Sequence, residues 1–369
     1  MSKSNGQKRE PLFHIVKRST VPSWAAWLIR IGAVVLALLV CAVVTVVITG
    51  QNPAEVYSAI IFGAVGSPRR IWSLLQNLAM LLCVSLAVTP AFKMKFWNIG
   101  AEGQALMGGF ATAACMILFG DKLPSYLLFP VMIITSIVAG AIWAFIPAFF
   151  KAKWNTNETL FTLMMNYIII GVVRWLQGGP WEGRPGSQII PQFDRAATLP
   201  KVLGVHCGWI IVLILVVFMH VYMNHTKHGY EIAVIGDSIN TARYAGMNVG
   251  HVMMRTMFLS GAISGLVGFI VASGANTTLY DGVAAGVGFT SITVAWLSQL
   301  NAFAMIVISM MLAIISKGAE TLQTRLAVPA SISDIITGIL LFCMLGCEFF
   351  INYRLIFRSS KTEKEAAKE

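Results

Sequence analysis

The sequence predicts an all-α polytopic membrane protein, because of its composition, its long apolar runs and the positions of its basic residues. Charged residues are 12% of the 369 residues, about half the share that is usual in soluble proteins. Hydrophobic residues reach 57%. A soluble chain of this composition would lack the polar side chains needed to cover its surface, so its preferred solvent is lipid.

Apolar runs of about 20 residues can each cross a bilayer core of ~30 Å. The chain offers such runs near 25–49, 71–91, 98–119, 124–150, 158–176, 208–224, 253–273, 286–316 and 332–353. As one helix the eighth run would be about 46 Å long, so we expect it to break at Asn301, beside Ser298. The expected total is about ten membrane segments, two of them short. Asn155 and Glu158 have the spacing of a capping box at the start of the fifth run.

Basic residues predict the orientation, because cytoplasmic loops of membrane proteins are enriched in Lys and Arg. By this rule two loops are cytoplasmic: the loop after the second run, with Lys93 and Lys95, and the loop after the fourth run, with Lys151. Arg69 and Arg70 fall on the outer side and depart from the rule. The expected organisation is a basic cytoplasmic tail (1–20), a single membrane domain (21–355) with a cytoplasmic loop (225–252), and a cytoplasmic C-terminal tail (356–369).

Several function classes are disfavoured. The net charge of +11 lies in short clusters between apolar runs, which is not the pattern of a nucleic-acid-binding surface. The chain has no G-x-x-x-x-G-K-[ST] loop for ATP phosphates and no H-E-x-x-H motif. His225 and His228 could form a metal pair, but solvated loop histidines are the simpler interpretation because no third ligand is evident. We therefore expect no catalytic residue, no metal and no cofactor bound by this chain.

The loop 225–252 contains the stretch Gly229–Val249, which predicts a short amphiphilic helix over Ile239–Ala245. Two interpretations are open. The helix could dock in a groove on a cytoplasmic partner, or it could be an ordinary helix at the membrane surface.

Two apolar segments are interrupted at their starts by glycine and polar residues, one in each half of the chain. They are Asn98–Gln104 and Gly286–Leu297, and the predicted topology brings them in from opposite faces. Such a pair predicts inverted repeats with a binding site between them, where half-helix N-termini donate amides to a polar ligand. The alternative is that the glycines only permit close helix packing, which is the preferred interpretation for Gly261 and Gly265.

Asn166 should lie about 12 Å into its helix and near the midplane, where its amide needs a neighbouring helix or a polar solute as partner. Glu102 could instead complement a helix N-terminus. The candidate pathway residues are Asn98, Glu102, Gln104, Asn166, Tyr167, Gly286, Gly288 and Thr290.

Four blocks together carry a family resemblance. They are Phe96–Gln104, Asn157–Tyr167, Gly286–Leu297, and Gly229–Val249 with its continuation Leu259–Gly268. In their order along the chain these blocks resemble permease subunits of bacterial ABC importers, in the branch for simple sugars, branched-chain amino acids and nucleosides, and they are most similar to the nucleoside-type members. The resemblance covers about 70–350. The chain departs from the family pattern after Leu297, where the family commonly has a Gly-Arg or similar pair and then a proline.

The resemblance implies a permease that lines the translocation pathway in a bacterial plasma membrane and hydrolyses nothing. It also implies a second permease chain, the same or a sister, a separate cytoplasmic ATPase that uses ATP, an external substrate-binding lipoprotein and surrounding membrane lipid. The substrate would be a nucleoside, with a simple sugar as the alternative. The coupling residues carried over from the family are Gly229, Gly236, Asn240, Ala242, Arg243, Tyr244, Ala245 and Gly246. We expect Ala242 and Ala245 to lie in the face that packs against the ATPase.

A stand-alone ion-coupled carrier is the rival from a different class. It would need buried carboxylates, and the candidates are Glu102, Asp334 and Glu348, each close to the end of a segment. A membrane-embedded enzyme is weaker still, since no catalytic constellation is evident.

Overall fold

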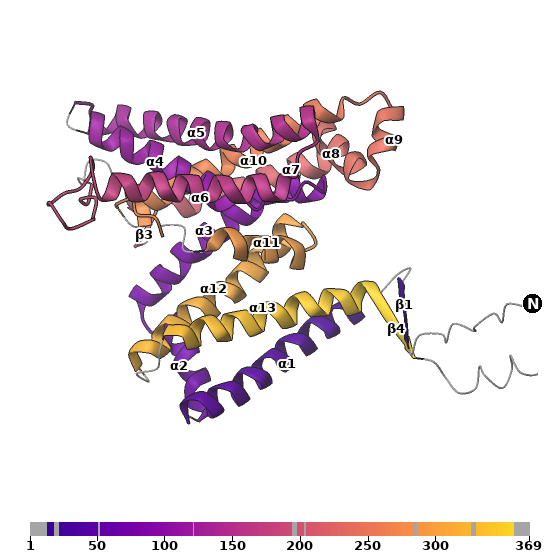
Figure 1. The fold of residues 1–369 in the computed structure, drawn as a ribbon. Helices are drawn as coiled ribbons and strands as arrows, with labels where there is room; N and C mark the ends of the chain where they lie inside the picture. Colours follow the sequence, from indigo (N-terminus) through magenta and orange to yellow (C-terminus); the bar gives the residue numbers. More distant parts are fainter. Residues whose placement is uncertain are drawn as a thin grey trace, which may run out of the picture. The chain divides into compact units, whose positions relative to one another are not determined.

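A computed structural model describes residues 13–17, 22–50, 52–120, 122–193, 198–202, 204–275, 277–282, 286–325 and 330–357 (Figure 1). The predicted tails 1–20 and 356–369 lie largely outside these residues. The chain forms two compact units, Met1–Val56 with Val328–Glu369, and Tyr57–Ala327. Whether 21–355 acts as one membrane domain stays a prediction.

The first unit is built on two long helices, α1 (Ser23–Thr49) and α13 (Ala330–Asn352), which pack against each other. The thiol of Cys41 on α1 lies 3.8 Å from the carbonyl oxygen of Ile336 on α13. Strand β1 (Phe13–Lys17) pairs antiparallel with β4 (Tyr353–Phe357), so the segments just outside the two helices are joined as well.

The second unit holds the remaining elements in chain order. They are α2 (Pro53–Val65), which begins in the first unit, α3 (Pro68–Lys93), α4 (Ala101–Phe119), α5 (Ser125–Trp154), α6 (Glu158–Gln177), β2 (Lys201–Val202), β3 (Val205–His206), α7 (Gly208–His225), α8 (Lys227–Asp237), α9 (Ile239–Tyr244), α10 (Val249–Ile270), the π-helix η2 (Val271–Ala275), α11 (Val287–Leu297) and α12 (Ala302–Arg325).

Eight helices among the described residues are long and apolar enough to cross a membrane, and α2 and α11 are shorter apolar helices. At 23 residues, α13 also has the length of a span. The protein is therefore all-α in class and passes the membrane several times, as the sequence predicted. The eighth apolar run does break: Gln299 and Leu300 adopt positive φ, and the side chain of Asn301 accepts a hydrogen bond from the Phe303 amide at the start of α12. Helix α2 was not predicted.

The capping prediction at the fifth run was wrong. Asn155 adopts a left-handed conformation (φ 52°) and ends α5, whereas Asn157 is the N-cap of α6. Its side-chain oxygen accepts from the Leu160 amide at 3.2 Å. Both asparagines precede the same apolar run, and spacing alone favoured the one that does not cap it.

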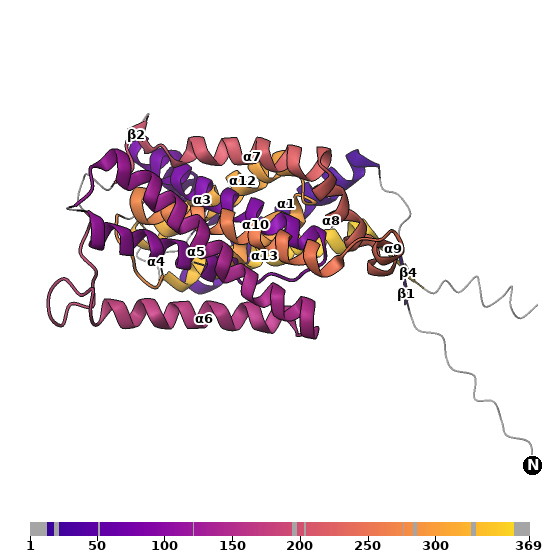
Figure 2. The same ribbon diagram turned by 90° about the horizontal axis from the view of Figure 1, so that it is seen from above.

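Helix α10 forms the centre of the second unit and packs against α3, α4 and α5. Gly265 of α10 lies directly against the backbones of two neighbouring helices. A β-carbon on Gly140 of α5 would be 2.6 Å from the Gly265 α-carbon, and a β-carbon on Gly108 of α4 would be 2.5 Å from the same atom. The packing role predicted for Gly261 and Gly265 is confirmed. In Figure 2, α6 and α7 lie on opposite sides of this core, while α8 and α9 lie at one end. That end is called the α9 end below, and the opposite one the β2–β3 end.

Candidate translocation site and coupling surface

The segment that leads into α4 is held by a buried amide pair. The Gln104 side-chain nitrogen donates to Asn98 Oδ1 at 3.0 Å, and Asn98 Nδ2 lies 3.3 Å from Gln104 Oε1. The same Asn98 nitrogen donates to the Ser260 hydroxyl of α10 at 3.2 Å. Both amides are buried. These two predicted pathway residues therefore bind the start of α4 to α10.

Asn166 of α6 binds the same segment from the other side. Its Oδ1 accepts from the Gly103 amide at 2.9 Å, and its Nδ2 donates to the Ile99 carbonyl at 3.0 Å. Thr162, one turn earlier, accepts from the Ile99 amide. Asn166 is buried, whereas the neighbouring Tyr167 is 67% exposed. The amide thus has protein partners, as the helix-packing alternative anticipated, and solute contact stays a prediction.

The two interrupted segments meet in space, although 184 residues separate the groups that join them. Glu102 Oε1, in the first turn of α4, accepts from the Gly286 amide at the start of α11 at 3.1 Å. A β-carbon on Gly288 would lie 2.5 Å from the Glu102 β-carbon, so only glycine allows this approach. Gly286 has φ 73°, a conformation that glycine adopts without strain. Thr290 is half-buried one turn further and donates to the Gly286 carbonyl.

The second carboxylate oxygen of Glu102, Oε2, is buried and has no hydrogen-bond partner within the described residues. Glu102 lies in α4, and one of its carboxylate oxygens caps the N-terminus of α11. It therefore complements the N-terminus of a second helix and not only that of its own. A carboxylate is favourable there because the amides at a helix N-terminus carry partial positive charge. The junction of the α4 and α11 N-termini is the candidate translocation site.

An aromatic cluster that the sequence did not predict joins the segments of this junction. Trp97 and Trp296 stack with ring centroids 5.8 Å apart, and Phe92 meets both edge-on. The indoles are 46% and 38% exposed. Trp97 directly precedes Asn98 and Trp296 lies near the end of α11, so the cluster joins the same two segments. No spacing signal pairs residues so far apart in the chain.

Helix α6 also holds the segment that precedes α11. Arg174 Nε and Asp281 Oδ2 form an ion pair at 2.7 Å, and the Asp281 amide donates to the Gln177 side chain at 3.1 Å. The α6 helix thus contacts the first interrupted segment through Asn166, near the middle of the helix, and the chain that leads into the second through Arg174, near its C-terminal end.

The predicted amphiphilic helix is present as α9, which is capped by Ser238: its hydroxyl accepts from the Thr241 amide. Asn240, Arg243, Tyr244, Ala245 and Gly246 are exposed, and Tyr244 reaches 93%. These five residues, called the α9 surface below, lie on α9 or directly after it, and α9 lies at one end of the unit (Figure 1).

Three of the predicted coupling residues face inward instead. Ala242 is fully buried within the chain, so the expectation that it presents a docking face was wrong. A β-carbon on Gly236 would meet the Lys93 carbonyl at the end of α3, and one on Gly229 would meet the Met223 carbonyl. These residues seat α8 and α9 on the rest of the chain.

An ion pair fixes α8 to α10. Arg255 Nη2 donates to Glu231 Oε2 at 2.7 Å, and both side chains are largely buried. The Arg255 guanidinium holds the pKa of Glu231 below its usual range, chiefly through this hydrogen bond. Arg255 and Ser260 lie on one helix about 8 Å apart along its axis, so α10 connects α8 to Asn98.

A cavity of about 790 Å³ opens beside the α9 surface. It lies between α8–α9, the segment that follows α3 and the junction of α5 with α6, and Lys95, Asp237 and Arg243 are among its lining residues. Lys151 and Glu158 in its wall are paired at 2.9 Å. The α9 end therefore combines a protruding helix with a polar recess.

Comparison with known proteins identifies the family. The family model described as "Branched-chain amino acid transport system / permease component" matches residues 70–345. The chain is 31% identical to the glucose ABC transporter permease protein TsgB13 of Haloferax volcanii over 92% of each chain. It is 28% identical to the guanosine ABC transporter permease protein NupP of Bacillus subtilis, with 92% of this chain and 97% of that protein covered. The nucleoside ABC transporter permease protein NupB of Lactococcus lactis is 25% identical over 93% and 96%. The chain belongs to this family of ABC transporter permease components.

Proposed function

We propose that the protein imports a nucleoside across a bacterial plasma membrane, with the α9 end and both termini in the cytoplasm. Members of the family are transport subunits, and a separate ATPase subunit hydrolyses ATP in such importers. The guanosine and nucleoside relatives support the substrate class. The orientation is supported by Lys95, Lys151 and Arg243, which line one cavity at the α9 end.

The observation that carries the proposed pathway is the meeting of α4 and α11 at the Glu102–Gly286 hydrogen bond. Two broken segments whose N-termini meet inside a membrane protein give a polar site where lipid would otherwise exclude a nucleoside. Asn98, Gln104 and Asn166 hold the start of α4 in place against α10 and α6. Tyr167 is exposed on the outer face of α6, where a second permease chain, identical or sister, would complete the pathway.

The ATPase docks on the α9 surface in this proposal, and its motion is passed on by two rigid contacts. One is the Glu231–Arg255 ion pair to α10, and the other is the close approach of Gly236 to the end of α3. Because Ser260 of α10 binds Asn98, movement of α10 changes the position of the α4 N-terminus. An external substrate-binding lipoprotein delivers solute at the β2–β3 end.

Reconstitution of the chain with its ATPase and binding protein in proteoliposomes tests the substrate class. We expect ATP-driven uptake of guanosine or uridine that unlabelled glucose does not inhibit. Uptake of glucose without nucleoside would establish the sugar alternative, which the Haloferax volcanii relative favours. Uphill uptake driven by an ion gradient with no ATPase would refute the coupling proposed here.

A further inference from the structure

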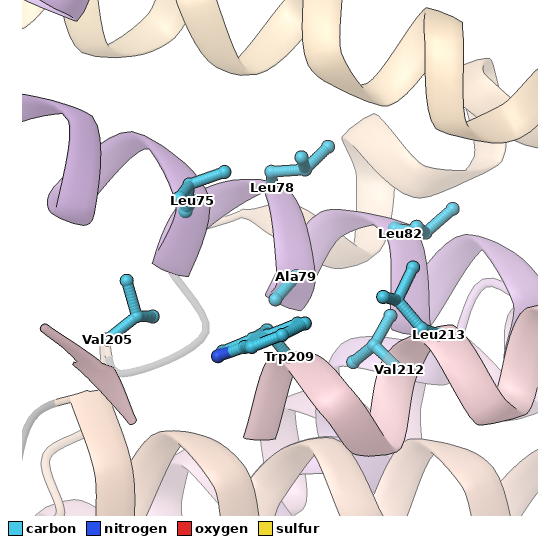
Figure 3. Close-up of a pocket in the computed structure, with 8 residues that line it drawn as sticks. All are labelled: Leu75, Leu78, Ala79, Leu82, Val205, Trp209, Val212 and Leu213. Carbon is cyan, nitrogen blue, oxygen red and sulfur yellow. The ribbon is translucent and has the colours of Figure 1, made fainter. Parts of the chain in front are cut away.

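An apolar groove lies between α3 and α7, away from the candidate translocation site. It has a volume of about 290 Å³, and every residue that lines it is Leu, Ala, Val or Trp. On α3 the lining runs from Leu75 to Leu82, about 10 Å along the helix axis. Figure 3 shows the Trp209 indole of α7 lying against Ala79, with Val205 of β3 at one end of the groove.

The lining decides the chemistry of the occupant. A nucleoside or a sugar would lose its hydrogen bonds to water in this groove and find none in return, which makes binding unfavourable. A hydrocarbon chain has no such cost. The groove runs along two helices that are long and apolar enough to cross a membrane, so the hydrocarbon within reach is that of membrane lipid.

The β2–β3 end of the groove carries exposed cations. Arg69 lies in the first turn of α3, six residues and about 9 Å along the axis before Leu75. Lys201 lies on β2, which pairs with β3. The hairpin reaches α3 directly, because a β-carbon on Gly204 would meet the Trp72 indole. Tryptophans at 72 and 209 also suit the boundary between hydrocarbon and headgroups.

Arg70 has a different role from Arg69. Its Nη1 donates to the Phe62 carbonyl of α2 at 2.9 Å, and its guanidinium lies 5.1 Å from the Phe62 ring centroid. It therefore ties α2 to α3. Arg69 is exposed beside it, on the side of the membrane where the charge rule does not expect cations.

We propose that this groove binds one acyl chain of an anionic phospholipid, whose headgroup lies at the β2–β3 end near Arg69 and Lys201. The site goes beyond the transport function and does not depend on the identity of the transported solute. It also gives the departure of Arg69 from the positive-inside rule a physical reason, since a basic side chain near the membrane surface attracts anionic headgroups.

Two neighbouring residues of α7 allow a matched test of the acyl-chain site. Leu213 lines the groove and is 47% exposed, whereas Ile214 is 63% exposed and does not line it. The full chain is purified from membranes and its bound phospholipid measured by native mass spectrometry, with added phosphatidylglycerol and phosphatidylcholine as probes. We expect Leu213→Trp to lose the bound phosphatidylglycerol, and Ile214→Trp to retain it as the wild type does.

Equal lipid retention in Leu213→Trp and the wild type would overturn the proposal. So would loss of a dimer in Leu213→Trp with no change in lipid, because the groove would then be a contact between two copies of the chain.

The headgroup site is tested with a second set of variants, which does not depend on the folding of Leu213→Trp. Arg69→Glu and Lys201→Glu should each lower the preference for phosphatidylglycerol over phosphatidylcholine by about fivefold, the factor that corresponds to ~1 kcal/mol per basic residue. Lys122→Glu, an exposed cation on the α4–α5 loop, is the control and should leave the preference unchanged. An unchanged preference in both test variants would place the headgroup elsewhere and overturn this assignment.

Discussion

The Glu231–Arg255 ion pair is the contact whose loss should most directly uncouple ATP hydrolysis from transport. Glu231→Gln keeps the size of the side chain and removes its charge. The Arg255 guanidinium, which lies 2.7 Å from the carboxylate in the native protein, would then lose its ionic partner. Helix α8 would remain packed on the end of α3 through Gly236, so the variant should insert and assemble.

The magnitude follows from the exposure of the pair. A hydrogen bond between buried charged groups contributes about 1.5–3 kcal/mol. The two side chains here retain 27% and 15% of their exposure, so solvent screening lowers the expected loss to about 1–2 kcal/mol. A loss of this size lowers the equilibrium constant for packing of α8 on α10 by about 5- to 30-fold.

The assay is the ratio of nucleoside transported to ATP hydrolysed, measured with the reconstituted complex. We expect this ratio to fall in Glu231→Gln and in Arg255→Lys while ATP hydrolysis continues. Glu320→Gln removes the exposed Lys317–Glu320 pair of α12 and should leave the ratio unchanged. A wild-type ratio in both pair variants would refute the idea that α8 transmits motion through α10.

Three further predictions follow from the packing. Gly288→Ala places a methyl group 2.5 Å from the Glu102 β-carbon of α4. This overpacking should lower the free energy of unfolding by about 1–3 kcal/mol and impair uptake. Gly171→Ala is the control and should be neutral, because the space around Gly171 is open. Burial lowers the pKa of His206 to about 4 from 6.5. As the pH falls, the imidazole of His206 therefore takes up a proton more readily in the unfolded chain than in the folded one, which favours unfolding. Thermal stability should drop between pH 6.5 and 4, by at most about 3 kcal/mol in free energy, and His206→Gln should remove that dependence, as scanning fluorimetry can measure. Ala242→Glu should destabilise the permease itself, whereas Ala245→Glu should insert normally and fail to bind the ATPase in pull-down; the reverse pattern would contradict the α9 surface.

The membrane helices could be predicted because lipid imposes a length and an apolar composition that the sequence displays directly. The break near Asn301 was predictable for the same reason, since one helix would have been too long. Helix α2 was missed because, at 13 residues, it is too short to register as a span. The N-cap of α6 was misassigned because Asn155 and Asn157 carry the same capping group.

The sequence was enough to predict which residues belong to the candidate site, but not which of them contact one another. Glycine and polar interruptions marked Asn98–Gln104 and Gly286–Leu297, but the contact of Glu102 with Gly286 exists only in the folded chain. The stacking of Trp97 on Trp296 was missed for that reason. Whether a helical alanine faces a partner or its own chain also depends on tertiary packing, which is why Ala242 was placed on the wrong side.

The glycine contacts of α10 limit which parts of the protein can move during transport. Helices α4, α5 and α10 meet backbone to backbone at Gly108, Gly140 and Gly265, with no side chains between them that could change rotamer. Such a block moves as one body, so any conformational cycle must be taken up at its margins. The π-helical turn Val271–Ala275 precedes α11 in the chain, and the break at Gln299 and Leu300 follows it. Such π-turns are frequent at functional sites, and left-handed residues other than glycine are frequent in switch regions. Spin labels paired between α4 and α5 should therefore keep one distance throughout the cycle, and labels between α4 and α11 should report two.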